Sequence, residues 1–275
     1  MATQAWSGDR TRRPEHEAPL PHGVGLSGLP GWRSAWQAFL PVPAGPDAPL
    51  CWIAFDTAAF DATAFTQAGI AYPPSLARSV RKRQAEFFFG RLAARTAVTS
   101  LGRPAVDLPI GPLGAPVWPY GLKGSISHCA GLAVATALDT ASVLGVGIDI
   151  EHVLEDEHRR DVLSTTVDDA ELAMLESLQP CGLSMNTLLT LVFSAKESLY
   201  KGASGRVGRF FDFSAARFSS LDPVRQRLEL SIQEDLCAEL RPGSTCIVDY
   251  AFVGAGTVFT SFLWSAPGGT QPALA

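Results

Sequence analysis

The sequence predicts an α+β fold of two similar lobes, with the functional site in the cleft between them. Its strand and helix patterns run in the order strand, long helix, strands, and then strand, helices, strands. The two series meet near residue 140 of 275. With 47% hydrophobic residues, the chain can bury a substantial core. No repeat is visible at the residue level, so the two-lobe prediction depends on element order alone.

Each expected element follows from apolar periodicity and turn residues. The longest helical pattern starts after Pro73-Pro74 and ends before Gly102, which predicts a helix over 75–101. An acid-led helix is expected over 168–178, and another helix from about 186 runs on to Lys201 or restarts at Ser194. Apolar and β-branched runs predict strands at 50–55, 125–127, 132–138, 143–150, 228–232, 246–253 and 258–264.

Proline content suggests how these elements divide into domains. We expect residues 1–48 to form a poorly ordered, Pro-rich arm with one short packed piece around 32–40. The N-terminal α+β lobe would then span 49–140. The C-terminal α+β lobe, carrying the metal site, would span 141–275.

Composition and charge exclude several classes of protein. A net charge of -5 with only 18% charged residues is atypical of disordered chains and of general nucleic-acid binders. No apolar stretch is long enough for a membrane span. The five cysteines form no CxxC pair, so neither a disulfide framework nor a zinc site is indicated. We therefore expect a cytoplasmic protein.

Two carboxylates close an apolar strand pattern in Gly147-Ile148-Asp149-Ile150-Glu151. Side chains alternate along a strand, so Asp149 and Glu151 share one face. Because two such close carboxylates repel each other, a hard divalent cation such as Mg²⁺ would offset the cost. The alternative is a strand end that emerges into solvent, with both acids hydrated.

A second motif surrounds Lys196 and Glu197. Ser194-x-x-Glu197 fits a helix capping box, in which Glu197 merely accepts a backbone amide. Lys196 would then lie in the first helical turn, where the helix dipole disfavours a cation. A lysine at that place makes sense if an anion docks there. Capping and catalysis therefore both stay open for this segment.

Anion-binding candidates lie outside these acidic motifs. Ser127 and His128 follow a small-residue turn and could bind a phosphate, although an ordinary core or surface histidine fits equally. Arg83 and Arg91 lie about 80° apart on the expected helix, so they share one broad face. That face is either a solvated basic stripe or a pair of arginines aimed at phosphates.

Four segments together resemble the 4′-phosphopantetheinyl transferases, in particular the monomeric type found with surfactin and siderophore synthetases. They occur in the family's order and with similar separations, within about residues 50–255. The matching segments are GRLAAR at 90–95, GAPVWPYGLKGSISHC at 114–129, GVGIDIE at 145–151 and FSAKESLYK at 193–201. The resemblance implies two lobes in a pseudo-twofold arrangement. It also implies transfer of the phosphopantetheine arm of coenzyme A to a serine of an apo carrier protein, with release of adenosine 3′,5′-bisphosphate.

The same resemblance implies roles for individual residues. Asp149, Glu151 and Glu197 would hold Mg²⁺, and Lys196 would contact the pyrophosphate. Glu197 would also be the candidate base for the carrier serine, the least secure of these roles. The nucleotide end of coenzyme A would contact Arg83, Arg91, Ser127 and His128. Members of the siderophore type usually carry Lys or Arg where this chain has Ile110, so one contact is missing or comes from elsewhere, with Lys123 as a candidate.

Two other functions are compatible with the residues. The carboxylates could serve another Mg²⁺-dependent nucleotide phosphotransferase or phosphohydrolase, or the chain could be an inactive module that binds carrier proteins. As a transferase of this family, we expect a monomer that acts on a peptidyl, aryl or acyl carrier of nonribosomal peptide, siderophore or polyketide synthesis. The candidate docking segments flank the site motifs, at 152–190 and after Lys201.

Overall fold

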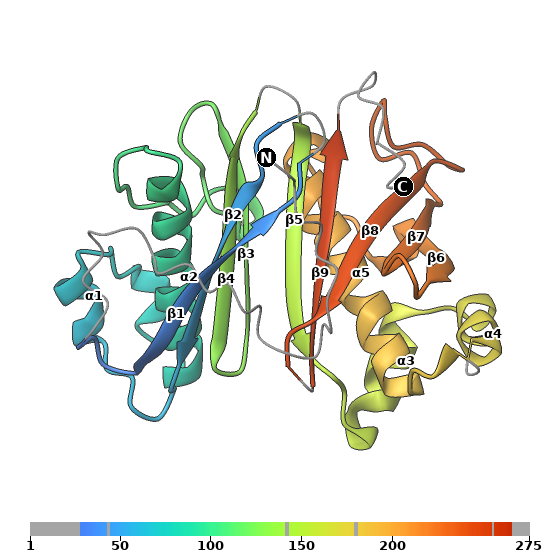
Figure 1. Ribbon diagram of the computed structural model, residues 1–275, viewed down its shortest axis with the longest axis horizontal. Helices are drawn as coiled ribbons and strands as arrows, with labels where there is room; N and C mark the ends of the chain where they lie inside the picture. Colours follow the sequence, from blue (N-terminus) through green and yellow to red (C-terminus); the bar gives the residue numbers. More distant parts are fainter. Residues whose placement is uncertain (1–27, 43–44, 141–142, 179–180, 255, 266–275) are drawn as a thin grey trace.

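The chain forms two antiparallel sheets that stand side by side, with one long helix against the far face of each sheet (Figure 1). The computed structural model describes residues 28–42, 45–140, 143–178, 181–254 and 256–265. The first sheet consists, in spatial order, of β1 (Trp32–Leu40), β2 (Ala48–Phe55), β4 (Leu132–Asp139) and β3 (Leu122–Cys129). The second consists of β5 (Val143–His152), β9 (Thr257–Ser265), β8 (Thr245–Phe252), β7 (Arg227–Ile232) and β6 (Ala216–Asp222).

The helices complete the α+β fold that the sequence predicts. They are α1 (Thr63–Ala68), α2 (Arg81–Ser100), α3 (Arg159–Thr166), α4 (Asp169–Ser177) and α5 (Met185–Val207). Among the described residues, no helix combines the length and apolar character that a membrane crossing requires. The change from one sheet to the other falls between Asp139 and Val143. The pseudo-twofold relation between the two halves stays a prediction.

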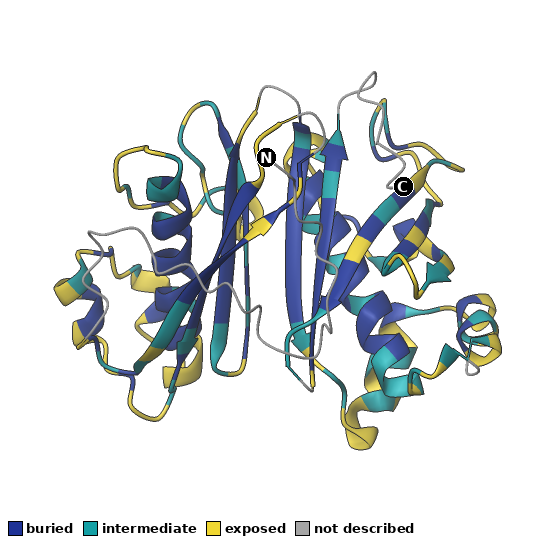
Figure 2. Ribbon diagram, in the orientation of Figure 1, coloured by how far each residue is buried: buried dark blue, intermediate teal, exposed yellow. Residues whose placement is uncertain are grey.

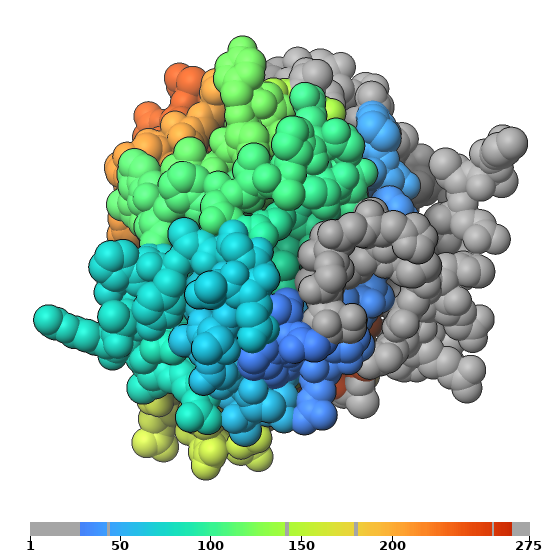
Figure 3. Space-filling model, turned by 90° about the vertical axis from the view of Figure 1, so that its left-hand side faces the viewer, coloured from blue at the N-terminus to red at the C-terminus, as the bar shows by residue number. Residues whose placement is uncertain are grey.

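The first half is held together by aromatic packing of α2 on its sheet. Phe89 stacks on Phe55 of β2 with ring centroids 4.6 Å apart, and Phe60 meets Phe88 at 5.7 Å. The inner face of α2 is accordingly coloured as buried in Figure 2. The segment from α1 to the start of α2 covers the outer surface of this half, in cyan in Figure 3.

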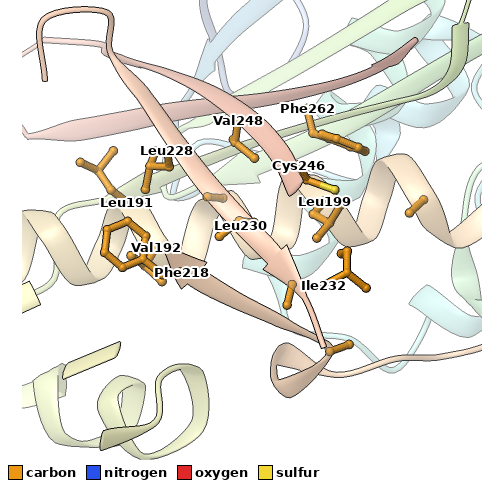
Figure 4. Close-up of a cluster of buried hydrophobic side chains, with 14 of the residues drawn as sticks. Leu191, Val192, Leu199, Phe218, Leu228, Leu230, Ile232, Cys246, Val248 and Phe262 are labelled. Atoms are coloured by element: carbon orange, nitrogen blue, oxygen red, sulfur yellow. The ribbon is translucent and has the colours of Figure 1, made fainter. Parts of the chain in front are cut away.

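In the second half, α5 packs on the sheet through an aliphatic core. Figure 4 shows that Leu191 and Leu199 of the helix point toward Leu230 and Val248 of the strands. This core supplies most of the apolar burial that fixes α5, and the position of α5 in turn places its opposite face beside β5.

The two halves also pack directly on each other. Trp52 of β2 lies with its ring centroid 5.4 Å from that of Phe259 of β9, within a buried cluster drawn from both sheets. The edge strands β3 and β5 face one another, where the hydroxyls of Ser125 and Ser127 accept the backbone N–H groups of Ile148 and Ile150. These bonds satisfy donors that an edge strand would otherwise leave unpaired.

Glycines let α5 lie directly on β5. A Cβ atom on Gly147 would be 1.8 Å from the Ser198 carbonyl oxygen, and one on Gly145 would be 2.0 Å from the Gly202 oxygen. Because side chains alternate along a strand, Asp149 shares the face of Gly147 that meets the helix. The close approach therefore brings the predicted metal-binding strand against α5.

The short packed piece expected around 32–40 is confirmed, since residues 32–40 form β1 and pair with β2, while residues 1–27 of the predicted arm lie outside the described residues. The structure differs from the predicted elements in other places. The long helix begins at Arg81, because a separate 3₁₀ turn occupies Pro74–Leu76. The helix near 186 runs without a break, so Ser194 is not a cap. The sequence patterns missed α1, α3 and β6.

Candidate active site

A cleft of about 1350 Å³ opens between the two halves. It is lined by residues of α2, β3, β5 and α5 and of the loop before β3. The structure brings seven of the eight predicted site residues to this cleft and leaves out Lys196; the seven are Arg83, Arg91, Ser127, His128, Asp149, Glu151 and Glu197. The cleft is therefore built from segments that are far apart in the sequence.

Asp149 lines the cleft and is 2% exposed. Its Oδ1 accepts hydrogen bonds from the Ser127 hydroxyl, at 2.8 Å, and from the Lys201 ammonium, at 2.6 Å. Its Oδ2 is buried without a hydrogen-bond partner. A buried carboxylate oxygen without a partner carries a large desolvation cost, which a bound cation would remove.

Two further carboxylates face Asp149. Burial, together with the charge of Asp149, raises the pKa of Glu151 to about 8. Burial also raises the pKa of Glu197, with Asp149 adding to the rise and Lys201 opposing it. Both shifts arise chiefly because burial disfavours the charged carboxylate, and the negative charge of Asp149 adds to them.

This oxygen-rich set fits a hard divalent cation in its chemistry. Mg²⁺ prefers carboxylate oxygens and leaves positions for substrate phosphates. The three carboxylates do not, however, bring their ligand atoms within 4.8 Å of one another. Among the described residues, the group that does so is a different and exposed one, made of Glu155, Glu157 and His158.

Lys196 lies away from the cleft, contrary to the prediction. Its ammonium forms an ion pair with Glu171 of α4 at 2.7 Å and donates to the Thr166 carbonyl at 2.7 Å. Both side chains of the pair are almost completely buried. The physical reason is helix phase: α5 is continuous, so Lys196 points about 100° away from Glu197 and into the second half.

Lys201 lies where Lys196 was expected. It stands four residues after Glu197, hence about 40° away on the helix and on the same face. Besides Asp149, it donates to the Ser127 hydroxyl at 3.1 Å. The spacing of Glu197 and Lys201 in the sequence indicates this position, because a Glu at i and a Lys at i+4 share one helix face.

His128 also lines the cleft and lies among charged groups. Its Nε2 accepts from the Arg83 guanidinium at 2.9 Å, since arginine can only donate. Its Nδ1 lies 3.7 Å from a carboxylate oxygen of Glu86. Burial, with Arg83 and Lys201 nearby, lowers the pKa of His128 to about 4. The ring is therefore neutral at pH 7 and can donate one hydrogen bond.

Arg91 is a buried cation, 8% exposed. Among the residues that the structure describes, it forms no ion pair, and its Nε and Nη1 atoms have no hydrogen-bond partner. Its guanidinium lies 4.9 Å from the ring centroid of Phe87. Burial and the charge of Arg83 lower its pKa. Since Arg91 also lines the cleft, its free donors mark a place for an anion.

The loop before β3 forms the apolar rim of the cleft. Ile110 lies on this rim and is 46% exposed, so the side chain that departs from the family pattern does face the cleft. Lys123 of β3 also lines it. The side chain considered as a substitute for the missing contact therefore also faces the cleft. Burial raises the pKa of the Cys129 thiol to about 12, so this thiol is protonated at neutral pH.

Comparison with known proteins identifies the family. The family model of the 4′-phosphopantetheinyl transferase N-terminal domain matches residues 72–138, and the model of the 4′-phosphopantetheinyl transferase superfamily matches residues 145–252. The enterobactin synthase component D of Salmonella typhi is 38% identical over 174 residues, which cover 62% of this chain and 70% of that protein. The chain belongs to the 4′-phosphopantetheinyl transferase superfamily.

Other members of the superfamily show the same level of similarity. The enterobactin synthase component D of Escherichia coli (strain K12) is 38% identical over 147 residues, covering 52% of this chain and 68% of that protein. The 4′-phosphopantetheinyl transferase PptT of Mycobacterium tuberculosis is 36% identical over 146 residues, covering 53% and 62%. These findings confirm the predicted family. The chain is a phosphopantetheinyl transferase, with coenzyme A as the donor and a carrier protein as the acceptor.

Proposed function

We propose that the cleft between the halves binds coenzyme A beside one Mg²⁺ ion, and that the acceptor is a carrier protein of siderophore or other nonribosomal peptide synthesis. The observation that carries the proposal is Asp149, a buried carboxylate with one unpartnered oxygen, facing two carboxylates of raised pKa. The carrier class follows from the siderophore-type relatives, which include enterobactin synthase component D of two bacteria.

In this proposal the nucleotide end of coenzyme A lies at the end of the cleft that holds Arg83, Arg91 and His128. The free donors of Arg91 would bind one phosphate group, and the neutral ring of His128 would donate to another. Lys201 would contact the pyrophosphate in the role that we had assigned to Lys196. Positioning and charge neutralisation dominate the catalysis of phosphoryl transfer, so these contacts account for most of what the protein must supply.

Asp149, Glu151 and Glu197 would hold the Mg²⁺ ion. Bound there, the ion would neutralise the charge of the pyrophosphate. Glu197 would also be the candidate base that takes the proton from the carrier serine. The serine oxygen forms a bond to the phosphorus that carries the pantetheine arm, the bond from that phosphorus to the nucleotide breaks, and adenosine 3′,5′-bisphosphate leaves.

We propose further that the chain acts as a monomer in the cytoplasm. Both sides of the cleft come from one chain, so a second copy is not needed to complete the site. All five cysteines are free thiols, which is compatible with a reducing compartment.

A direct assay tests the proposed function. The full chain is incubated with coenzyme A, Mg²⁺ and apo peptidyl, aryl and acyl carrier proteins, and each carrier is weighed by mass spectrometry. We expect the phosphopantetheine adduct on a peptidyl or aryl carrier, and its loss when the metal is chelated. Full transfer in the presence of chelator would contradict the metal site. Modification of acyl carriers alone would contradict the proposed pathway.

A further inference from the structure

Arg95 joins two segments of the first half at a place outside the cleft. It lies on α2, four residues after Arg91, and its side chain is 14% exposed. Its guanidinium donates to the carbonyl oxygens of Ala68 at 2.6 Å and Gly69 at 2.7 Å, and it forms an ion pair with Asp107. These partners come from the end of α1 and from the loop before β3. Among the described residues that line the cleft, neither member of the ion pair appears.

The chemistry of arginine suits this junction. Carbonyl groups at the end of a helix have no partner within the helix, and the planar guanidinium can donate to several acceptors at once. Asp107 is held from a second side, because its Oδ2 accepts the backbone N–H of Ala71 at 3.0 Å. Arg95 and Asp107 therefore fasten the chain after α1 to the loop before β3.

Both fastened segments continue into walls of the cleft. The connection between α1 and α2 supplies Ser75, Leu76 and Ser79 to one wall and leads directly into Arg83. The loop before β3 supplies residues 110 and 112–116 to another wall. Arg95 thus lies behind two walls that meet the proposed position of the nucleotide.

The wall formed by the loop is a small hairpin that is fixed at its two ends. Two backbone hydrogen bonds, of 2.8 and 2.9 Å, close residues 109–117 on themselves. The far end is fixed on β3, because a Cβ atom on Gly124 would lie 2.5 Å from the ring of Trp118. The near end is fixed by Leu108, which is 7% exposed, and by the ion pair of Asp107. Loss of that ion pair would free the near end while the hairpin itself persists.

We propose that Arg95 is a positioning residue for coenzyme A, which holds these two walls at the spacing that the nucleotide end requires. The proposal rests on the proposed function, because it takes this cleft as the coenzyme A site. A wall that is held in place beforehand need not be ordered when the ligand binds, so its release should weaken binding. The transfer step should be spared, because the groups proposed for it lie on β5 and α5, namely Asp149, Glu197 and Lys201.

The test combines steady-state kinetics of the full chain, with Mg²⁺ and an apo peptidyl carrier, and calorimetry with coenzyme A. In Arg95→Met, the KM and the Kd for coenzyme A should each rise about tenfold, while kcat at saturating coenzyme A stays within about twofold of normal. Adenosine 3′,5′-bisphosphate, a probe of the nucleotide end alone, should lose affinity by the same factor. Arg95→Lys should recover part of the affinity. A purely structural role would instead lower the amount of folded enzyme, and so the apparent kcat, at an unchanged KM.

Two further variants make the test specific. Arg103→Met is the matched control, because Arg103 follows α2 and pairs with Asp139 of β4 at 2.9 Å, and both side chains are about half exposed and lie outside the cleft lining. It should bind coenzyme A normally. Asp107→Asn covers the case in which Arg95→Met fails to fold, because the Asp107 side chain is 40% exposed. It should weaken coenzyme A binding in the same way, with kcat preserved.

The outcomes separate this proposal from the proposed function. A normal Kd for coenzyme A in the folded variants of Arg95 and Asp107 would overturn the proposal, and so would a fall in kcat at an unchanged KM. If the cleft were not the coenzyme A site at all, Arg91→Leu, which alters the cleft lining itself, would also leave the affinity unchanged.

Discussion

Lys201 and Asp149 form an ion pair of 2.6 Å across the interface between α5 and β5. The Ser127 hydroxyl from β3 bonds to both partners, so the pair joins three elements and both halves of the chain. The contact exists because glycines on β5 let the helix approach the strand. Lys201, and not Lys196, is therefore the lysine of α5 whose ammonium lies in the cleft.

Replacing Lys201 should impair catalysis, and because it removes the cation beside the buried carboxylate of Asp149 it should also lower the stability of the metal-free chain. In Lys201→Met, the pyrophosphate loses a cation that the transition state needs, and we expect kcat to fall about 100-fold or more. Lys201→Arg should recover part of the rate. Rates are measured by carrier modification, and circular dichroism monitors folding. A Lys201→Met enzyme with more than half of the normal rate would show that the ammonium has no role in transfer.

Replacing Lys196 should act on stability instead. Lys196→Met leaves the buried carboxylate of Glu171 without its partner, which typically costs 3–5 kcal/mol in the free energy of unfolding. Urea denaturation measures this cost, and calorimetry should show a coenzyme A affinity close to normal in the folded fraction. The opposite pattern, normal stability with lost affinity, would restore the role that the sequence suggested.

Replacing Arg91 should lower the affinity for coenzyme A without lowering the stability of the ligand-free protein. Arg91→Leu removes a buried charge that has no anionic partner, so the ligand-free protein should be as stable as the unaltered chain or more stable by about 1 kcal/mol. Its affinity for coenzyme A should fall about tenfold to 100-fold, the range for a lost charge-assisted hydrogen bond. Thermal unfolding and calorimetry measure the two effects. A less stable variant with unchanged affinity would mean that Arg91 serves the fold alone.

His128 should make stability depend on pH. Its pKa in the folded chain, about 4, lies below its ordinary value of 6.5. Between these values the unfolded chain binds a proton that the folded chain does not, so stability is full above pH 6.5 and falls as pH drops toward 4. Glutamine does not titrate, so in His128→Gln the free energy of unfolding should fall less between pH 7 and pH 5, by about 1–2 kcal/mol. Urea denaturation at the two pH values checks it, and parallel losses in both proteins would contradict the assignment.

Much of the fold follows from local patterns in the sequence. The apolar run of β5 alternates, and Ile148 and Ile150 lie in the cluster between the sheets while Asp149 faces α5. The sequence also predicts the end of α2 before Gly102, because glycine readily adopts the left-handed conformation that ends a helix. In the structure Gly102 has a φ of +71°. The first sheet was harder, because the alternating residues of β1 lie beside a Pro-rich segment that resembles a loose arm.

The site was less predictable where it depends on the rotation of a helix. Ser194-x-x-Glu197 matches a capping box locally, yet α5 passes through it without a break and the true capping box lies at Asp168 and Glu171. The choice between Lys196 and Lys201 depends on which face of α5 meets β5. That face is set by Gly147 and Gly202, through contacts between residues more than fifty positions apart.

The most direct test of the account is the position of the metal. Crystals of the full chain grown with coenzyme A and Mn²⁺ in place of Mg²⁺ would reveal the ion by its anomalous scattering. We predict one strong peak in contact with Asp149, Glu151 and Glu197 and with the pyrophosphate, with Lys201 beside it. A peak at the exposed group of Glu155, Glu157 and His158 and none in the cleft would contradict the proposed site.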